Sequence, residues 1–176
     1  MKKSLLYFLV IMCFSLSVSP YAECAVWNGA SWGMSIENVK KKTKISIVPI
    51  QNPDFKFSVP MSHMGSKVTI AGKNFNTYFN IPTTGLNYIY LSYSEHNDPL
   101  THSKVFDSLV SKYGSPIAPK QIKQTGYGGY NETYSWITKD TYIKFSYMHF
   151  WIGNKGFSDT VLIEYSPKNN SSNELL

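Results

Sequence analysis

A single amphipathic helix, predicted over residues 98–116, lies between two sets of strand-like segments, and this arrangement limits the possible folds. We expect Asp98 to cap the first free N–H groups, and Pro99 suits the first helical turn. Gly114 and Pro116 end the helix. Its apolar face is formed by residues at helical spacing: Phe106, Leu109, Val110 and Tyr113. That face requires a partner, and the flanking segments indicate a sheet.

The segments on the two sides of this helix follow the same order. A shorter helix, N-capped by Ser35 and running to about Thr43, precedes the first set. Strands rich in β-branched and aromatic residues are predicted at 67–71, 74–81 and 86–94, and again at 132–138, 141–150 and 160–166. IYLSYS at 89–94 aligns with VLIEYS at 161–166, about 70 residues later. We therefore predict an α+β fold, a two-layer sandwich from a duplicated α-β-β-β unit, with an antiparallel sheet and its helices on one face.

The segments between these elements are expected to be loops. Residues 45–64 contain three prolines and are interpreted as mostly loop with one edge strand at 55–59. Residues 118–130 are polar, end in GYGGY and are also predicted to be a loop.

The N-terminus has the layout of a secretory signal peptide over residues 1–22. Lys2 and Lys3 precede a short apolar run that ends in small and turn residues. This run is shorter than the roughly 20 residues that a membrane-spanning helix needs. We expect cleavage after Ala22, with Ala25 as the alternative, and a periplasmic or secreted protein. The expected division is leader 1–22, first unit 23–97, second unit 98–166 and disordered tail 167–176.

The cysteines make an internal disulfide impossible in the processed chain. Cys13 leaves with the leader, and Cys24 stays alone. Glu23 stands before Cys24, where lipid attachment would need a small residue, so we expect no lipid anchor. We interpret Cys24 as a tolerated thiol rather than an intermolecular bridge or reactive site, because no reactive motif surrounds it.

The charge pattern argues against sequence-specific nucleic-acid binding. The chain has 17 Lys+Arg and 11 Asp+Glu, and its net charge of +6 falls to +4 without Lys2 and Lys3. Every one of these cations is lysine. Arginine's planar fork is the group that reads guanine edges and clamps phosphates, and this chain lacks it. The basic balance suits either an anionic partner or solubility.

A short motif at the first helix resembles a known group. Gly33, Met34, Ser35 and Val39 give the pattern G-M-S-x-x-x-V, followed by an antiparallel meander. This helix start is similar to that of the SmpA/OmlA-like and β-lactamase-inhibitor-protein-like families of exported bacterial proteins. The resemblance implies a protein-binding or envelope-assembly role without chemistry. The chain lacks the paired cysteines of the inhibitors and the lipobox of the SmpA-like lipoproteins, so no particular partner follows from it.

The densest polar cluster consists of Glu95, His96, Asp98 and His102. Carboxylates and imidazoles at such spacing can bind zinc or transfer protons. Asp98 is already assigned as a cap, however, and the chain has no HExxH or Cys-x-x-Cys spacing. We therefore predict no enzymatic activity, no cofactor and no metal site, with His96, Asp98 and His102 as the weak metal candidates. A small hydrolase using Glu95, His96 and His102 is the less favoured alternative.

Aromatic residues in loops and strand connections point instead to recognition. Aromatic residues make up 15% of the chain, and aromatic side chains outside a core supply rigid contact area. The predicted binding residues are Tyr127, Tyr130, Phe150, Trp151 and Phe157. Capping of the open ends of the sandwich is the other interpretation of these residues.

The predicted function is an exported, non-enzymatic module that holds another protein in the bacterial envelope or outside the cell. The alternative is a glycan- or peptidoglycan-binding domain, in which Trp27, Trp32 or Trp151 stacks on sugar rings.

Overall fold

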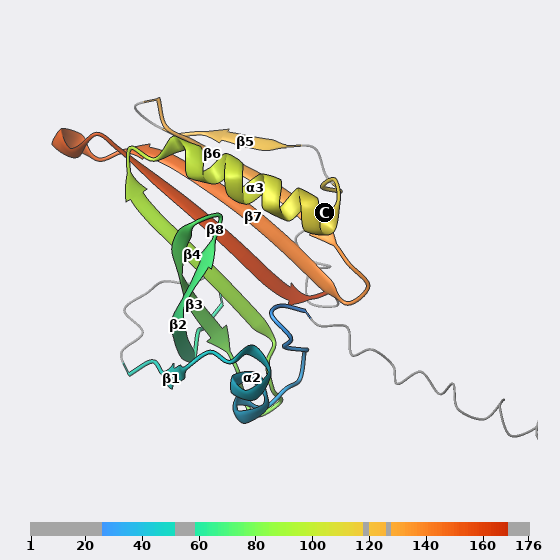
Figure 1. Cartoon of the computed structure of the whole chain (residues 1–176). Helices are drawn as coiled ribbons and strands as arrows, with labels where there is room; N and C mark the ends of the chain where they lie inside the picture. The colour runs from blue at the N-terminus through green and yellow to red at the C-terminus, as the bar shows by residue number, and fades with distance from the viewer. Residues whose placement is uncertain (1–25, 52–58, 118–119, 126–127, 169–176) are drawn as a thin grey trace, which may run out of the picture.

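The computed structural model describes residues 26–51, 59–117, 120–125 and 128–168, which form one antiparallel eight-stranded sheet and two α-helices (Figure 1). The strands are β1 (Ile47–Pro49), β2 (His63–Ile70), β3 (Lys73–Asn80), β4 (Tyr88–His96), β5 (Gln121–Gln124), β6 (Tyr130–Ile137), β7 (Thr141–Trp151) and β8 (Phe157–Pro167). The helices are α2 (Ile36–Thr43) and α3 (Pro99–Tyr113), with a 3-10 turn, η2 (Gly153–Lys155), between β7 and β8. This arrangement confirms the α+β class.

Some of the expected features lie outside the described residues. They are the leader at 1–22, Cys24, residues 55–58 of the expected edge strand, Tyr127, and the tail from 169 onward. The start of the predicted tail is different from expectation, because Pro167 is the last residue of β8 and the Lys168 N–H donates to the Asp140 carbonyl oxygen at 3.0 Å.

The strand order is β1-β2-β3-β4-β8-β7-β6-β5, so the last strands of the two halves meet in the middle. Each helix is followed by four strands rather than the three of the predicted unit. In the first half, β1 and the start of β2 lie within the segment 45–64, which was expected to be mostly loop. The prediction of a loop over 118–130 is wrong in part, because β5 pairs there with β6, from Gln121 opposite Thr133 to Gln124 opposite Tyr130. All four residues of β5 are exposed. A strand with no buried face has no apolar alternation, which is why its pattern gave no signal.

The pairing of β4 with β8 places apolar residues at the centre of the core. Leu91 lies opposite Ile163, and the flanking pairs on the same face are Ile89 with Tyr165 and Tyr93 with Val161. All six residues are buried. Burial on one face of this central ladder fixes the register, since a slip of one residue would turn the apolar set outward.

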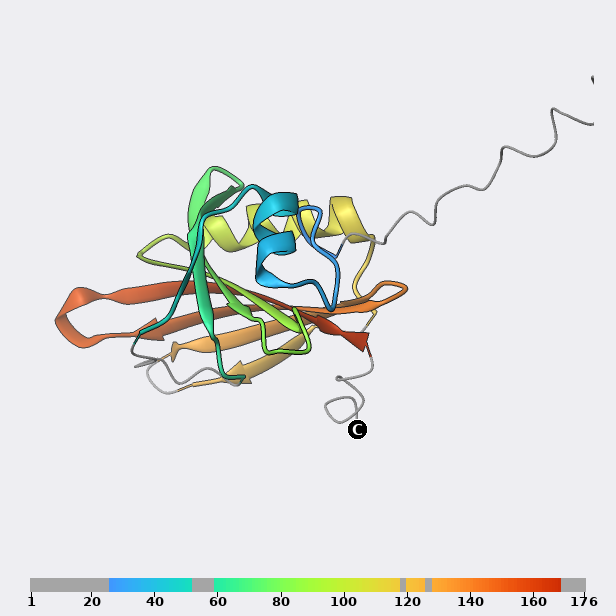
Figure 2. The ribbon, with the colours of Figure 1, turned by 90° about the horizontal axis from the view of Figure 1, so that it is seen from below.

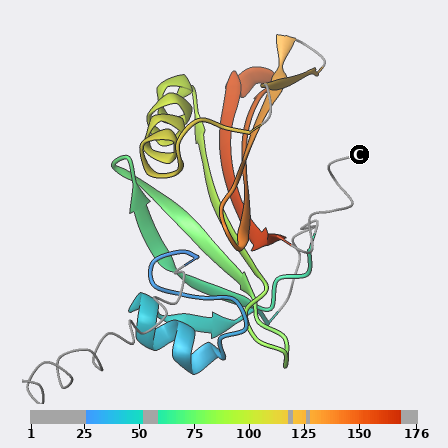
Figure 3. The ribbon, with the colours of Figure 1, turned by 90° about the vertical axis from the view of Figure 1, so that its right-hand side faces the viewer.

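Figures 2 and 3 show α2 and α3 on the same side of the sheet. Val105 and Leu109 of α3 are buried, and the Phe106 ring centroid lies 4.5 Å from that of Tyr134 in β6. Val39 of α2 is buried in the same apolar cluster. The predicted apolar face of α3 and the buried side of α2 therefore pack into one continuous core.

The helix limits agree closely with the capping signals. The Ser35 side chain accepts a hydrogen bond from the Asn38 N–H at 3.4 Å at the start of α2. Pro99 is the first residue of α3, and the Gly114 N–H closes that helix by donating to the Val110 carbonyl oxygen at 2.8 Å.

The expected role of Asp98 as a cap is wrong in its detail. No helix N–H donates to its side chain. Instead Asp98 Oδ2 accepts hydrogen bonds from Thr101 Oγ1 at 2.6 Å and Tyr93 Oη at 2.7 Å, and lies 2.8 Å from Lys73 Nζ. The Asp98 N–H donates to Asp159 Oδ2 at 2.7 Å. Neighbouring strands thus supply most of the partners of this residue, which sequence spacing along the helix does not reveal.

Candidate functional site

Six side chains form a continuous aromatic row from the β7–β8 hairpin to α3. The members of this aromatic row, in spatial order, are Trp151, Phe157, His149, Tyr130, Tyr147 and His102. Neighbouring ring centroids along it lie 5.1, 4.1, 5.3, 5.8 and 3.9 Å apart. The two closest contacts, at interplanar angles of 12° and 8°, are face-to-face stacks.

The outer end of the aromatic row is exposed. Trp151 is 46% exposed, whereas Phe157 and Tyr130 are half-buried. Phe150 is 37% exposed, and because it is the strand neighbour of Trp151 it points to the other face of the hairpin. In Figures 1 and 2 this hairpin projects beyond the rest of the sheet. The structure thus brings Tyr130, Trp151 and Phe157 together and places Phe150 on the opposite side.

A buried carboxylate supports the middle of the aromatic row. Asp159 is 1% exposed, and its Oδ1 accepts a hydrogen bond from Tyr147 Oη at 2.5 Å and lies 2.7 Å from His149 Nδ1. Its Oδ2 accepts the Asp98 N–H. Burial, and next the hydrogen bond to Asp159, raise the pKa of the Tyr147 hydroxyl far above its usual value. Tyr147 therefore remains a protonated donor.

A second carboxylate ties the start of α3 to the β2–β3 turn. The hydrogen bond from Lys73, followed by that from Thr101, holds the pKa of Asp98 well below its ordinary range. The same contact raises the pKa of Lys73. The Asp98 N–H donates to Asp159, so the two carboxylate residues belong to one hydrogen-bonded network around the beginning of the helix.

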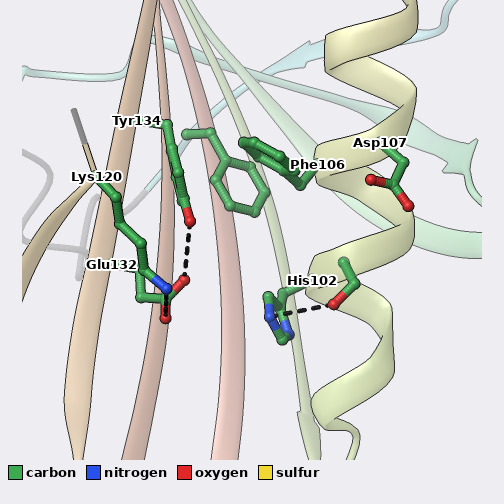
Figure 4. A pocket seen from close by; sticks show the side chains of 8 residues that line it. His102, Phe106, Asp107, Lys120, Glu132 and Tyr134 are labelled. Atoms are coloured by element: carbon green, nitrogen blue, oxygen red, sulfur yellow. Dashed lines mark hydrogen bonds and ion pairs between the residues drawn. The ribbon is translucent and has the colours of Figure 1, made fainter. Parts of the chain in front are cut away.

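A pocket of about 220 Å³ lies beside the aromatic row, between α3 and strands β6 and β7 (Figure 4). The labelled side chains that line it are His102, Phe106, Asp107, Lys120, Glu132 and Tyr134. The Glu132 carboxylate forms an ion pair with Lys120 and accepts a hydrogen bond from Tyr134 Oη at 3.3 Å. The hydrogen bond to Glu132 raises the pKa of Lys120, and burial, then the charge of Glu132, raises the pKa of Tyr134.

The predicted cluster at the end of β4 does not converge on one point. Glu95 and His96 are exposed and, as strand neighbours, point to opposite faces of the sheet. His102 stacks on Tyr147, and Asp98 is bound to Lys73, Tyr93 and Thr101. Within the residues that the structure describes, no three or more His, Cys, Asp or Glu side chains are placed to hold a metal ion.

The tryptophans differ sharply in exposure. Trp27 and Trp136 are buried, and the half-buried Trp32 donates its indole N–H to the Asp140 carbonyl oxygen and to Thr141 Oγ1, each at 3.1 Å. Trp151 is therefore the tryptophan with the most accessible ring.

No family model, no curated protein and no solved structure matches the chain. None of the helices in the described part of the chain combines the length and the apolar character needed to cross a membrane.

The sequence analysis gave no site role to Asp159, His149, Tyr147 or Glu132. In β7, Tyr147 and His149 alternate with Ser146 and Met148, and this period predicts that the two rings share a face. Asp159 lies opposite His149 only in the observed β7–β8 register. The sequence of the turn between the two strands did not determine this register, so the pairing could not be predicted.

Proposed function

We propose that this chain is an exported, non-enzymatic binding module that holds another protein through the tip of the β7–β8 hairpin. The observation that carries the proposal is the exposure of Trp151 at 46% and Phe150 at 37% on one projecting hairpin. Large aromatic side chains at exposed positions mark interaction sites because they bury much area with few rotatable bonds.

Packing contacts within the hairpin hold the exposed Trp151 ring in position, and this favours a role in recognition. Trp151 packs edge-on against Phe157, and Phe157 stacks on His149, whose Nδ1 is bonded to the buried Asp159. The Ile152 N–H donates to the Gly156 carbonyl oxygen at 2.9 Å and closes the turn. A side chain already held in position loses less entropy on binding.

Site-specific photocrosslinking tests the proposed surface. A benzophenone amino acid is placed at position 151 in the exported protein and, as a matched control, at position 117, where Ile117 is 52% exposed. Crosslinking is performed in intact cells. We expect one dominant adduct from position 151 that is absent from position 117. The same set of adducts from both positions would contradict the proposed surface.

Export is tested separately. The leader that motivates it comprises the basic start and apolar run of residues 1–22. We expect the protein recovered from the envelope or medium to begin at Glu23. A protein that retains Met1 and stays in the cytoplasm would contradict export while leaving the hairpin surface to be judged by crosslinking.

A glycan ligand is the second candidate, and the accessible ring of Trp151 favours it, since sugar rings stack on exposed indoles. Titration with peptidoglycan fragments, followed by tryptophan fluorescence, separates the two. A saturable change in tryptophan emission that is lost in Trp151→Phe supports a glycan ligand. Emission that does not change during the titration favours a protein partner.

We also propose that the two halves arose by duplication, as the parallel order of their segments suggests. The register of β4 and β8 supports this: alignment of IYLSYS with VLIEYS makes Leu91 equivalent to Ile163, and these two residues pair with each other. The same alignment makes Ile89 equivalent to Val161 and Tyr93 equivalent to Tyr165. Ile89 pairs with Tyr165 and Tyr93 pairs with Val161, so a two-fold rotation that interchanges the halves converts one pair into the other.

A further inference from the structure

We propose that the pocket between α3, β6 and β7 binds an organic cation, namely the primary ammonium or guanidinium group of a ligand, with Glu132 as its counter-charge. This site lies on a different part of the fold from the hairpin tip.

The first observation is a buried carboxylate whose cationic partner is accessible. The Glu132 side chain is 10% exposed, whereas that of Lys120, with which it pairs, is 40% exposed. A buried carboxylate requires a compensating charge and hydrogen bonds. Lys120 is well placed to swing into solvent and yield its position to an incoming cation. Its own ammonium group, beside Glu132 and Tyr134, shows the chemistry that the site accepts.

The second observation is the aromatic wall. Three aromatic rings, those of Phe106, Tyr134 and Phe145, line the pocket together. The ring centroids of Phe106 and Tyr134 lie 4.5 Å apart, and the Phe145 centroid lies 6.0 Å from each of them. Aromatic faces attract cations, and aliphatic stems pack on them. These rings therefore suit an alkylammonium or alkylguanidinium group rather than a fully hydrated metal ion.

The third observation is the sign of the local charge. Glu132 and Asp107 line the pocket with a single ammonium, that of Lys120, in a chain whose net charge is +6. The lining is therefore rich in acceptors and complementary to a donor cation.

The volume limits the size of the ligand. At about 220 Å³ the pocket is smaller than the about 300–1,000 Å³ typical of drug-sized ligand sites. It suits a single side chain or a small amine rather than a cofactor.

NMR titration of the full processed chain tests the proposal, with n-butylammonium and blocked lysine (Nα-acetyl-lysine N-methylamide) as probes and acetate as the anionic control. We expect shifts at His102 and Tyr134 with either cation. Glu132→Gln, which keeps the shape, should weaken binding about tenfold. Lys120→Met, which removes the internal competitor, should strengthen it severalfold. Glu164→Gln is the matched control, because Glu164 is a similarly shielded carboxylate paired with Lys144 on the other face of the sheet, and it should change nothing.

Two results overturn the proposal. One is the absence of pocket shifts with both amines, or equal binding by the wild type and Glu132→Gln. The other is preferential binding of acetate that is lost in Lys120→Met, which would show that the pocket selects anions. If Glu132→Gln does not fold, Asp107→Asn at the exposed rim should still weaken amine binding about twofold. Tighter binding of blocked lysine than of butylammonium indicates that the ligand is a side chain of a polypeptide, and the reverse indicates a small free amine.

Discussion

Asp159 Oδ1 lies 2.7 Å from His149 Nδ1, opposite it across the β7–β8 ladder, at a position where Asp159 is 1% exposed. The same carboxylate accepts the Tyr147 hydroxyl and, through Oδ2, the Asp98 N–H at the start of α3. One side chain therefore joins the projecting hairpin to the helix that covers the sheet.

Asp159→Asn should lower the free energy of unfolding by about 2–3 kcal/mol, because the amide cannot accept at both positions and leaves a buried donor unpaired. Urea denaturation followed by circular dichroism measures the change. The control is Asp140→Asn in the exposed β6–β7 turn, expected within about 0.5 kcal/mol of wild type. Equal stabilities of the two variants would show that the buried network contributes nothing.

Asp98 should make stability depend on pH in the acid range. Lys73, and then Thr101, hold its pKa below the value of the unfolded chain, which is about 3.9. Such a carboxyl contributes stability that is complete above the unfolded pKa and is lost as the pH falls through the folded pKa. We therefore expect the free energy of unfolding to fall below about pH 4, and less steeply in Asp98→Asn.

Urea denaturation at about pH 7 and about pH 3 checks this slope. Glu95→Gln is the control, because Glu95 is exposed at the end of β4 and should leave the slope unchanged. An Asp98→Asn protein with the full wild-type slope would assign the acid sensitivity to other carboxylates.

Local signals in the sequence predicted the helices well. Ser35, Pro99 and Gly114 act on their own backbone neighbourhood, so their effect can be read without knowledge of the fold. β5 lacked such a signal because it is stabilised by pairing with β6 and has no buried face. The strand count of the second half was therefore underestimated.

Three members of the aromatic row, Tyr130, Trp151 and Phe157, were predicted as binding residues from the sequence. Trp151 and Phe157 flank a glycine-containing turn, and that local context indicated recognition. The pocket at Glu132 depends on α3 crossing β6, and the Asp159 network depends on register. Both are long-range relationships, which residue types and spacing alone do not determine.

Gly85→Ala should be strongly destabilising. The backbone of Gly85 has φ +95°, and a Cβ there would lie 2.2 Å from the Gly33 carbonyl oxygen. This contact is fixed by hydrogen bonds at 2.8 Å from the Gly33 N–H to the Leu86 carbonyl oxygen and from the Leu86 N–H to the Met34 carbonyl oxygen. Neither backbone can move without breaking them. We expect a loss of more than about 3 kcal/mol, measured by urea denaturation.

Gly72→Ala isolates the contribution of the clash. Gly72 has φ +80°, but a Cβ at this position would have no neighbouring atom within 4 Å, so its substitution carries only the conformational cost of about 1–2 kcal/mol. Equal losses in the two variants would mean that the segment carrying Gly33 moves away freely.

Trp151 should account for most of the tryptophan emission that iodide can quench. Trp136 and Trp27 are 1% and 7% exposed and Trp32 is half-buried, whereas Trp151 is 46% exposed. We therefore expect Trp151→Phe to remove most of the quenchable emission without changing the urea midpoint, because an exposed side chain adds little to folding. Trp32→Phe is the control and should leave the quenchable fraction nearly intact while lowering stability by about 1 kcal/mol, since it deletes the indole donor to Asp140 and Thr141.

If a partner identified by crosslinking at position 151 covers the hairpin tip, its addition should protect the wild-type emission from iodide. Full quenching in the presence of saturating partner would place the contact elsewhere on the protein.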